Sequence, residues 1–182
     1  FVNPTPVKNP SLFFKYLKDM NKLDDWFIDV NIDYIDQANK YINNIKNKYA
    51  YLLSSLSINC DFDISKFINE KQILNYVSNM IDYINVEVND DLSLYKVFDK
   101  LVDINDYLYL RLVIKNEDLF DKYNKYQTIM SKPNVMGKDL IELGYTPSDS
   151  FNEILNYAHE LRLMGYDKQE VISKINILLS SF

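Results

Sequence analysis

The sequence contains few of the residues on which most active sites depend. Cys60 and His159 are the only cysteine and the only histidine among 182 residues. A conventional zinc site needs several cysteine or histidine ligands, so the sequence excludes one, and a single cysteine excludes a disulfide framework. We therefore predict no metal site, no cofactor and no catalytic residue in this chain. The lone cysteine indicates a reducing, cytoplasmic environment.

Glycine and proline are also scarce, with three and five copies. This is too few for the many tight turns of an all-β sandwich or barrel. Glycine-rich phosphate loops are excluded before Gly137, which is the first glycine of the sequence. No apolar run reaches the length of about 18 residues that a membrane span requires, and no signal peptide opens the chain. We therefore expect no membrane association.

One pair of aspartates has the spacing of a metal site, but the residues around it argue against one. Asp61 and Asp63 form an Asp-x-Asp pair, and paired aspartates can hold two metal ions for nucleotidyl transfer. Such a pair needs a rigid strand and a glycine-bearing loop beside it, and neither is present. Asp63 is more simply the N-cap of a helix that starts near Ile64.

The hydrophobic side chains that are present repeat at intervals of three and four residues. This spacing is typical of helices, and no glycine or proline interrupts it between Ser11 and Lys132. The β-branched segment 81–88 also fits a strand, but its spacing favours a helix. We predict an all-α body from the following sets: Phe13, Phe14, Leu17 and Met20; Ile35, Ala38, Ile42, Ile45 and Tyr49, continuing to Leu52, Leu53 and Leu56; Leu74, Val77, Met80, Ile81 and Ile84; and Val97, Phe98, Leu101, Val102 and Leu108.

Clear helix boundaries follow Pro133. Gly144 can close a short helix over 139–143 in the left-handed conformation, and Gly165 can close the next one. Thr146 is the predicted N-cap of that second helix, with Pro147 as its first residue. Asp167 and Glu170 are expected to cap a last helix. The predicted inward side chains are Phe151, Ile154, Leu155, Ala158 and Leu161 on the second helix, and Val171, Ile175, Leu178 and Phe182 on the last.

The charge distribution allows a polyanion partner at one place only. The net charge of −6 excludes a basic surface over the whole protein, and we expect no DNA partner. Residues 122–138, however, contain four lysines and no acidic residue. The lysines can meet phosphates, and two tyrosines beside them can stack on bases or riboses. A solvated helix end and linker explains the same residues equally well. The candidate residues are Lys122, Tyr123, Lys125, Tyr126, Lys132 and Lys138.

Two segments resemble one enzyme family. Gly137-Lys-Asp-Leu-Ile-Glu-Leu-Gly144, then Pro147 and Glu153-Ile-Leu155, resembles the C-terminal region of bacterial CCA-adding enzymes, the tRNA nucleotidyltransferases of the poly(A) polymerase-like superfamily. The family's Pro-Gly-Pro element is only partly kept, as Pro147-Ser148-Asp149. The segment 10–27 resembles the family's neck, in which a helix ends in Leu-x-x-x-Phe. Ile28 replaces the proline that usually follows.

The resemblance implies a tRNA-binding region without its catalytic head. The implied domains are a lead-in over 1–10, a neck and body over 11–131 and a tail over 132–182. The first residue is Phe1 rather than Met, so we expect a fragment. The head of the parent enzyme would need Mg²⁺, CTP and ATP, and this region would hold the acceptor stem and elbow of tRNA beside that head. Arg162 and the helix start at Thr146 and Ser148 would add phosphate contacts, although plain helix capping explains the last two residues as well.

Two other interpretations remain open. Many bacterial members of the family carry an HD-type metal phosphohydrolase region between neck and tail. The corresponding segment here, 49–56, has no His-Asp doublet, so the body stands at that position without metal ligands. A degenerate HD-type domain with a regulatory role would need a pocket lined by buried polar groups. An all-helical protein-interaction or structural module without RNA binding would expose a large apolar patch.

Overall fold

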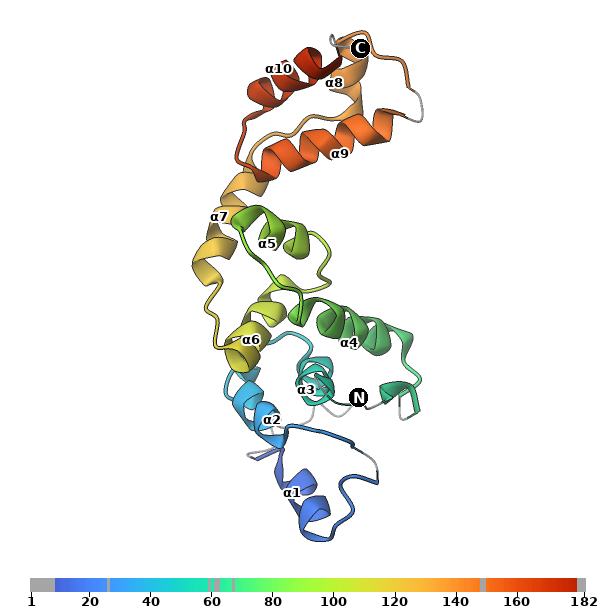
Figure 1. The fold of residues 1–182 in the computed structure, drawn as a ribbon, viewed down its shortest axis with the longest axis vertical. Coiled ribbons are helices and arrows are strands. Elements are labelled where there is room, and N and C mark those ends of the chain that lie inside the picture. Colours follow the sequence, from blue (N-terminus) through green and yellow to red (C-terminus); the bar gives the residue numbers. More distant parts are fainter. Residues whose placement is uncertain are drawn as a thin grey trace. The chain divides into compact units, whose positions relative to one another are not determined.

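A computed structural model describes residues 9–25, 27–58, 60, 63–66, 68–147 and 150–179, without the side chains of Ser150 and Leu179. This part of the chain forms ten α-helices and two 3₁₀-helices and contains no strand, which confirms the all-α prediction (Figure 1). The helices are α1 (Leu12–Asp19), α2 (Ile32–Asn39), η1 (Ile42–Asn44), α3 (Lys48–Ser57), η2 (Ile64–Lys66), α4 (Lys71–Ile84), α5 (Asp91–Phe98), α6 (Ile104–Lys115), α7 (Phe120–Ser131), α8 (Gly137–Glu142), α9 (Ser150–Leu163) and α10 (Lys168–Leu179).

The chain divides into two compact units. The first unit contains Phe1–Glu87 and Val97–Leu119, and the second contains Val88–Lys96 and Phe120–Phe182. The second unit therefore includes the first part of α5, and it starts again at the beginning of α7. The boundary predicted after Ser131 falls at the end of α7.

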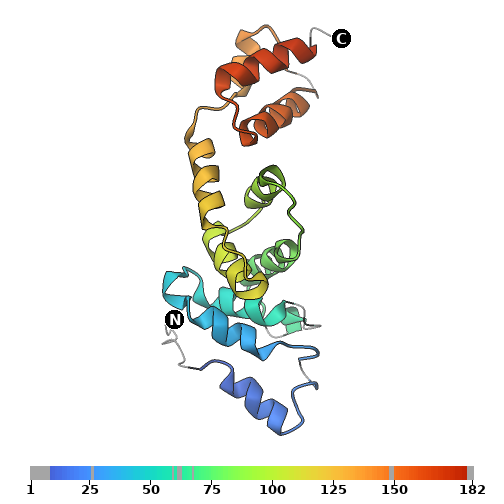
Figure 2. The same cartoon turned by 60° about the vertical axis from the view of Figure 1, so that its left-hand side comes forward.

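The core of the first unit lies among α2, α3, α4 and α6. In the first unit α3 packs against α2 and α4, and α6 packs against the same two helices (Figure 2). The apolar face predicted for α4 points inward, because Val77, Met80 and Ile84 are fully buried. Tyr51 of α3 and Tyr107 of α6 are the largest fully buried side chains. Helical spacing thus located most of the core of this unit, but the predicted core positions Tyr49 and Val102 were wrong, since these side chains are 49% and 56% exposed.

Asparagine and aspartate, rather than glycine and proline, separate the helices of the first unit. The predicted continuous pattern from Ile35 to Leu56 is divided into α2, η1 and α3. Asn47 accepts a hydrogen bond from the Ala50 N–H at 3.2 Å and begins α3. Asp103 accepts one from the Asp106 N–H at 3.0 Å and begins α6. Side chains of this kind satisfy the free N–H groups of a helix start.

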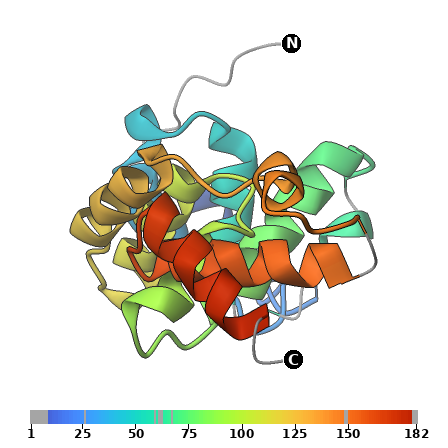
Figure 3. The ribbon, with the colours of Figure 1, turned by 90° about the horizontal axis from the view of Figure 1, so that it is seen from above.

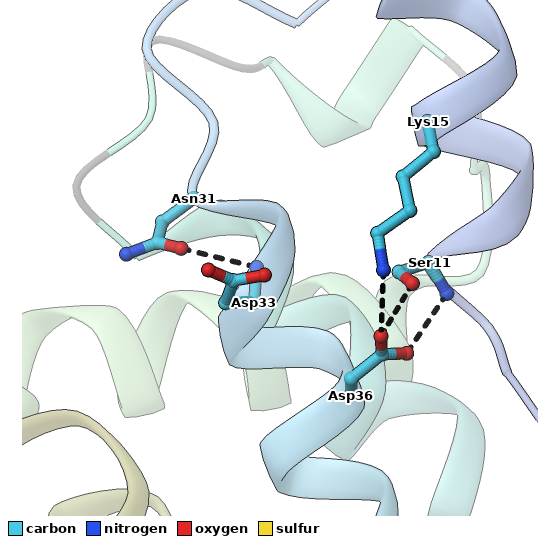
Figure 4. A network of polar contacts seen from close by, with 5 residues as sticks. All are labelled: Ser11, Lys15, Asn31, Asp33 and Asp36. Carbon is cyan, nitrogen blue, oxygen red and sulfur yellow. Dashed lines mark hydrogen bonds and ion pairs between the residues drawn. The ribbon is translucent and has the colours of Figure 1, made fainter.

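A polar cluster joins α1 to α2 (Figure 4). Asp36 accepts hydrogen bonds from the Ser11 N–H at 3.1 Å, from the Ser11 hydroxyl, and from Lys15 Nζ at 3.2 Å. Burial raises the pKa of Asp36, but the hydrogen bonds from Ser11 and Lys15 outweigh it and lower the pKa. Asn31 caps α2 by accepting from the Asp33 N–H at 3.1 Å. This cluster fixes the start of α1 against α2.

Most of the apolar residues of α1 point outward. Phe14 is buried, with its ring 5.2 Å from that of Phe27 in a T-shaped contact, and the partly buried Leu17 packs against the same cluster. The prediction that Phe13 and Met20 share the buried face of Phe14 was therefore wrong. The exposed fractions are 50% for Leu12, 61% for Phe13, 67% for Tyr16 and 58% for Met20.

The first unit also contains a buried carboxyl group. Asp106 of α6 is fully buried, and the Tyr76 hydroxyl of α4 donates a hydrogen bond of 2.6 Å to its Oδ2. Asn105 Nδ2 lies 3.4 Å from Oδ1. Burial is the largest cause of a raised pKa at Asp106. The hydroxyl of Tyr51 is buried without a hydrogen-bond partner in the described part of the chain, so this core is polar at its centre.

The core of the second unit lies among α8, α9 and α10 (Figure 1). In the view from above, α10 crosses α9 (Figure 3). Leu140 of α8, Ala158 and Leu161 of α9, and Val171 and Ile175 of α10 form one buried cluster. The core of this unit therefore joins three short helices.

Two glycines close the helices as predicted. Gly144 has φ of 91° and Gly165 has φ of 97°. The residue after each glycine donates a hydrogen bond back into the helix, from the Tyr145 N–H to the Leu140 carbonyl at 3.0 Å and from the Tyr166 N–H to the Leu161 carbonyl at 3.3 Å. These bonds are those of a Schellman cap. The predicted caps of α8 and α9 are confirmed.

The start of α10 is confirmed, whereas the predicted start of α9 was wrong. Asp167 accepts hydrogen bonds from the N–H groups of Gln169 and Glu170 at 2.9 Å, and Glu170 accepts from the Asp167 N–H at 2.8 Å. The structure starts α9 at Ser150, so Thr146 and Pro147 lie before the helix.

The inward face predicted for α10 is only partly correct. Val171 and Ile175 are buried, but Leu178 is 41% exposed because the buried cluster ends at Ile175. Phe182 lies outside the described residues. The last turn of α10 therefore extends beyond the core that α8 and α9 supply.

Candidate nucleic-acid interface

Three of the predicted RNA-binding residues are engaged inside the second unit. Lys122 of α7 forms an ion pair with Asp91 of α5, and the hydrogen bond that Lys122 Nζ donates to Asp91 raises the pKa of Lys122. Tyr126 is only 7% exposed, and its ring centroid lies 5.6 Å from that of Tyr95 on α5. Tyr123 stacks on Tyr126 at 6.3 Å and is half-buried. These residues hold α5 against α7, and Tyr126 has no exposed ring face for a base.

Arg162 is a structural residue in this conformation. It is 9% exposed, and its Nη2 donates to the carbonyls of Met130 at 2.6 Å and Lys132 at 2.8 Å. Its Nε is buried without a partner among the described residues. Arg162 thus ties the end of α7 to α9, and its guanidinium group is not presented to solvent for a phosphate.

The remaining lysines of residues 122–138, which we call the lysine strip, are exposed. Lys125, Lys132 and Lys138 all face solvent, and none takes part in an ion pair within the described residues. They lie on α7, just after α7, and at the start of α8. Thr146 is also exposed, between α8 and α9. Ser148 lies outside the described residues. The structure therefore reduces the predicted strip to three available cations.

Asp139 anchors the segment that joins α7 to α8. Its Oδ2 accepts a hydrogen bond from the Met136 N–H at 2.7 Å, and Lys168 of α10 donates to its Oδ1 at 2.7 Å. The hydrogen bond from Lys168, and then the one from Met136, lower the pKa of Asp139. Together with Arg162, Asp139 fixes the backbone of residues 132–136 at both ends.

A cavity of about 230 Å³ lies between this anchored segment and α9. Val135 and Ala158 are buried in its wall, and Met136 is half exposed at its edge. Two polar side chains, those of Asn134 and His159, also line it. This site was not predicted from the sequence, in which the single histidine, His159, was given no role. The full lining is Asn134, Val135, Met136, Gly137, Leu155, Ala158 and His159.

Gly137 lets the anchored segment lie close to α9. A Cβ atom at this position would be 3.2 Å from Cε1 of Phe151, which is closer than ordinary van der Waals contact between carbon atoms. The glycines at the two ends of α8 thus have different roles. Gly137 permits a close approach to α9, whereas Gly144 supplies a backbone conformation that other residues avoid.

A second cavity of about 350 Å³ lies in the first unit, beside α1. Lys15, Lys18, Asp29 and Asp33 contribute charges of both signs to its lining. Because these charges balance, the cavity has no electrostatic preference for a phosphate or for a cation. It is therefore a weaker candidate for RNA binding than the lysines of the second unit.

Two further features are absent from the described part of the chain. No group of three or more histidine, cysteine, aspartate or glutamate side chains is arranged there to hold a metal ion. None of the helices there has the length and apolar character needed to cross a membrane.

Comparison of the chain with protein-family models, curated proteins and solved structures finds no match. The resemblance to CCA-adding enzymes therefore rests on the quoted residues.

Proposed function

We propose that this chain is the RNA-binding region of a tRNA nucleotidyltransferase and that it positions a tRNA for a catalytic head. The observation that carries the proposal is the exposure of Lys125, Lys132 and Lys138, without ion pairs, around a segment that contains no acidic residue from 122 to 138. The order of the neck-like and tail-like segments in the sequence also supports it.

The contact is expected to be electrostatic and weak. Each phosphate neutralised by a lysine contributes about −0.7 to −0.9 to the slope of log affinity against log salt concentration. Three lysines therefore give a slope of about −2 to −3. The chain as a whole has a net charge of −6, so its acidic remainder repels RNA elsewhere. Opposing charges of this kind restrict the RNA to the part of the second unit that contains these lysines.

Positioning a rigid RNA does not require reading its sequence. Phosphate contacts fix the register of a bound nucleic acid, and shape recognition distinguishes a tRNA from a simple duplex. Holding the end of a tRNA near a reactive centre accelerates a reaction by proximity. Under the proposal this chain contributes to catalysis only through the distance at which it holds the RNA.

A binding titration with tRNA tests the proposal. The 182-residue chain is titrated with fluorescently labelled tRNA and with an unrelated RNA duplex of similar charge, at about 50 mM and about 200 mM salt. We expect tRNA to bind more tightly than the duplex at the lower salt concentration. Absence of binding to both RNAs at the lower salt concentration would overturn the proposal.

The second candidate is a protein-interaction module, and the outward face of α1 favours it. Leu12, Phe13, Tyr16 and Met20 form an apolar group there that no described side chain covers, with exposed fractions of 50–67%. Exposed apolar patches commonly mark sites of protein contact. Under this candidate the chain binds no tRNA at any salt concentration, so the same titration separates the two functions.

A further inference from the structure

We propose that the cavity between the anchored segment and α9 receives one unpaired base of the bound RNA. This inference rests on the function proposed above and extends it from phosphate contacts to a pocket. The cavity holds about 230 Å³, which is below the roughly 300–1,000 Å³ of pockets for drug-sized ligands. Its size therefore suits a single ring system rather than a larger molecule.

The chemistry of the lining matches a base. Val135, Leu155 and Ala158 supply apolar surface for the faces of a ring. The Asn134 amide contains both a donor and an acceptor for hydrogen bonds to the edge of a base, and the His159 imidazole is a second polar group in the lining. Pockets that bind flipped or unpaired bases combine these two features, apolar contact with the ring and hydrogen bonds to its edge.

The charges around the cavity favour a ligand that carries phosphates. Lys132 and Lys138 flank the lining segment 134–137 in the sequence and are exposed. Nearby carboxylates are neutralised, since Asp139 pairs with Lys168 and Glu160 pairs with Lys96. Glu153 lies two residues from Leu155 along α9, and residues at this spacing do not face each other. Among the described residues, a nucleotide in the cavity thus has two exposed cations beside the lining segment, and the carboxylates of Asp139 and Glu160 are paired.

The pocket is preorganised for binding. Arg162 fixes the backbone at Lys132 with a hydrogen bond of 2.8 Å, and Asp139 fixes it at Met136 with one of 2.7 Å. The opposite wall is the middle of α9, which packs on the core through Ala158 and Leu161. Because both walls are held by the fold, a base can enter without first ordering the segment, and this lowers the entropic cost of binding.

A pocket-filling variant of the full chain tests the inference. Ala158→Met places a longer side chain in the cavity, and Asn156→Met makes a comparable change at an exposed position of the same helix. Stacking of one base contributes about 1–3 kcal/mol, so we expect Ala158→Met to weaken tRNA binding at least about five-fold. Asn156→Met is expected to bind like the wild-type chain, and thermal unfolding confirms that each variant folds.

Nuclear magnetic resonance provides a readout that needs no variant. His159 is the only histidine, so its imidazole signals are assigned directly, and the Met136 methyl reports the edge of the cavity. Addition of tRNA is expected to shift both. If the wild-type chain binds tRNA while these signals stay unchanged and Ala158→Met binds normally, the inference is wrong and the lysine contact stands.

A third outcome separates the inference from the proposed function. If the chain binds no tRNA, the function proposed above is wrong, and titration with AMP and with CMP at millimolar concentration decides about the pocket. If a nucleotide shifts the signals of His159 and Met136, and if Asn134→Ala or Ala158→Met removes these shifts, the cavity is a nucleotide-binding site. No shift with either nucleotide rejects the site as well.

Discussion

At the residue scale, the cations of this chain fall into two groups. Arg111 and Arg162 are its only arginines, and both are buried with their guanidinium groups bonded to backbone carbonyls. Arg111 Nη1 donates to the carbonyls of Ile84 at 2.9 Å and Val86 at 3.2 Å. Arg162 does the same at the end of α7. The arginines therefore hold helix ends, and exposed lysines without ion pairs, such as Lys125 and Lys132, are left to meet a partner.

Loss of Arg162 is expected to destabilise the second unit. Arg162→Ala removes two hydrogen bonds made by a charged donor and leaves two carbonyls without it. We expect the free energy of unfolding to fall by about 2–3 kcal/mol, as measured by urea denaturation followed by circular dichroism. Lys125→Ala, at an exposed position of α7, is the control and should change stability by less than about 0.5 kcal/mol. Equal stabilities of the two variants would contradict the structural role.

Asp106 predicts a distinctive dependence of stability on pH. Burial raises its pKa in the folded chain, so the folded state binds the proton more tightly than the unfolded state. The resulting stabilisation is complete below the unfolded pKa of about 3.9 and is lost as pH rises through the folded pKa. Asp106→Asn cannot ionise, so this variant does not lose stability at this position as pH rises. We expect the stability of this variant relative to the wild-type chain to increase as pH is raised from about 4.

Other carboxylates of the chain have the opposite sign, which makes the comparison between variant and wild type necessary. Asp139 and Asp36 have lowered pKa values in the folded state. Their stabilisation is present above the unfolded pKa and is lost as pH falls through the folded one. Urea denaturation of both chains at several pH values isolates the effect of Asp106. A stability difference that does not change with pH would contradict its raised pKa.

At the element scale, α1 is held mainly by the buried Phe14, with the partly buried Leu17 beside it, and by a polar cluster. Phe14 is buried against Phe27, while its neighbour Phe13 is 61% exposed. We expect Phe14→Ala to lower the free energy of unfolding by about 3–4 kcal/mol. Phe13→Ala loses only an edge contact with Phe14 and should cost about 1 kcal/mol or less. The pair is compared by thermal unfolding, and similar losses from the two changes would show that α1 packs on another face.

Helical spacing and capping residues predicted most of the helices. The errors were confined to individual helix boundaries. The spacing of α4 and the glycines after α8 and α9 carry their signal within a few residues. The turns between α2 and α3 were missed because Asn47 ends the pattern without glycine or proline, and the capping bond of its side chain depends on the folded chain. The start of α9 was placed too early because Thr146 and Pro147 have the composition of a helix start.

The candidate site was harder to predict than the helices. Whether a lysine is available to bind RNA depends on whether it already pairs with a carboxylate. Lys122 pairs with Asp91, which lies 31 residues away in the sequence. Arg162 reaches the Lys132 carbonyl over 30 residues. The sequence alone groups Lys122 with the other lysines of 122–138 and leaves Arg162 as a further phosphate contact, because it contains no information about contacts between distant segments. The cavity beside His159 was missed for the same reason, since its two walls come from segments about 20 residues apart.

At the scale of the whole molecule, the account depends on where a polyanion can bind an acidic chain. The pI is about 4.8 and the net charge is −6, so non-specific attraction to RNA is excluded as an explanation of binding. Any affinity for tRNA must come from a local group of cations. The three exposed lysines of the second unit are that group in our proposal, and their contribution can be separated from net charge.

The most direct test compares two triple variants with the same net charge. Lys125, Lys132 and Lys138 are changed to glutamate in one, and Lys40, Lys71 and Lys115, which are exposed lysines of the first unit, are changed to glutamate in the other. The affinity for tRNA is measured for both and for the wild-type chain at about 50 mM salt. We predict that the first variant loses tRNA binding and that the second binds within a few-fold of the wild-type chain. Equal losses in the two variants, or no loss in the first, would contradict the account.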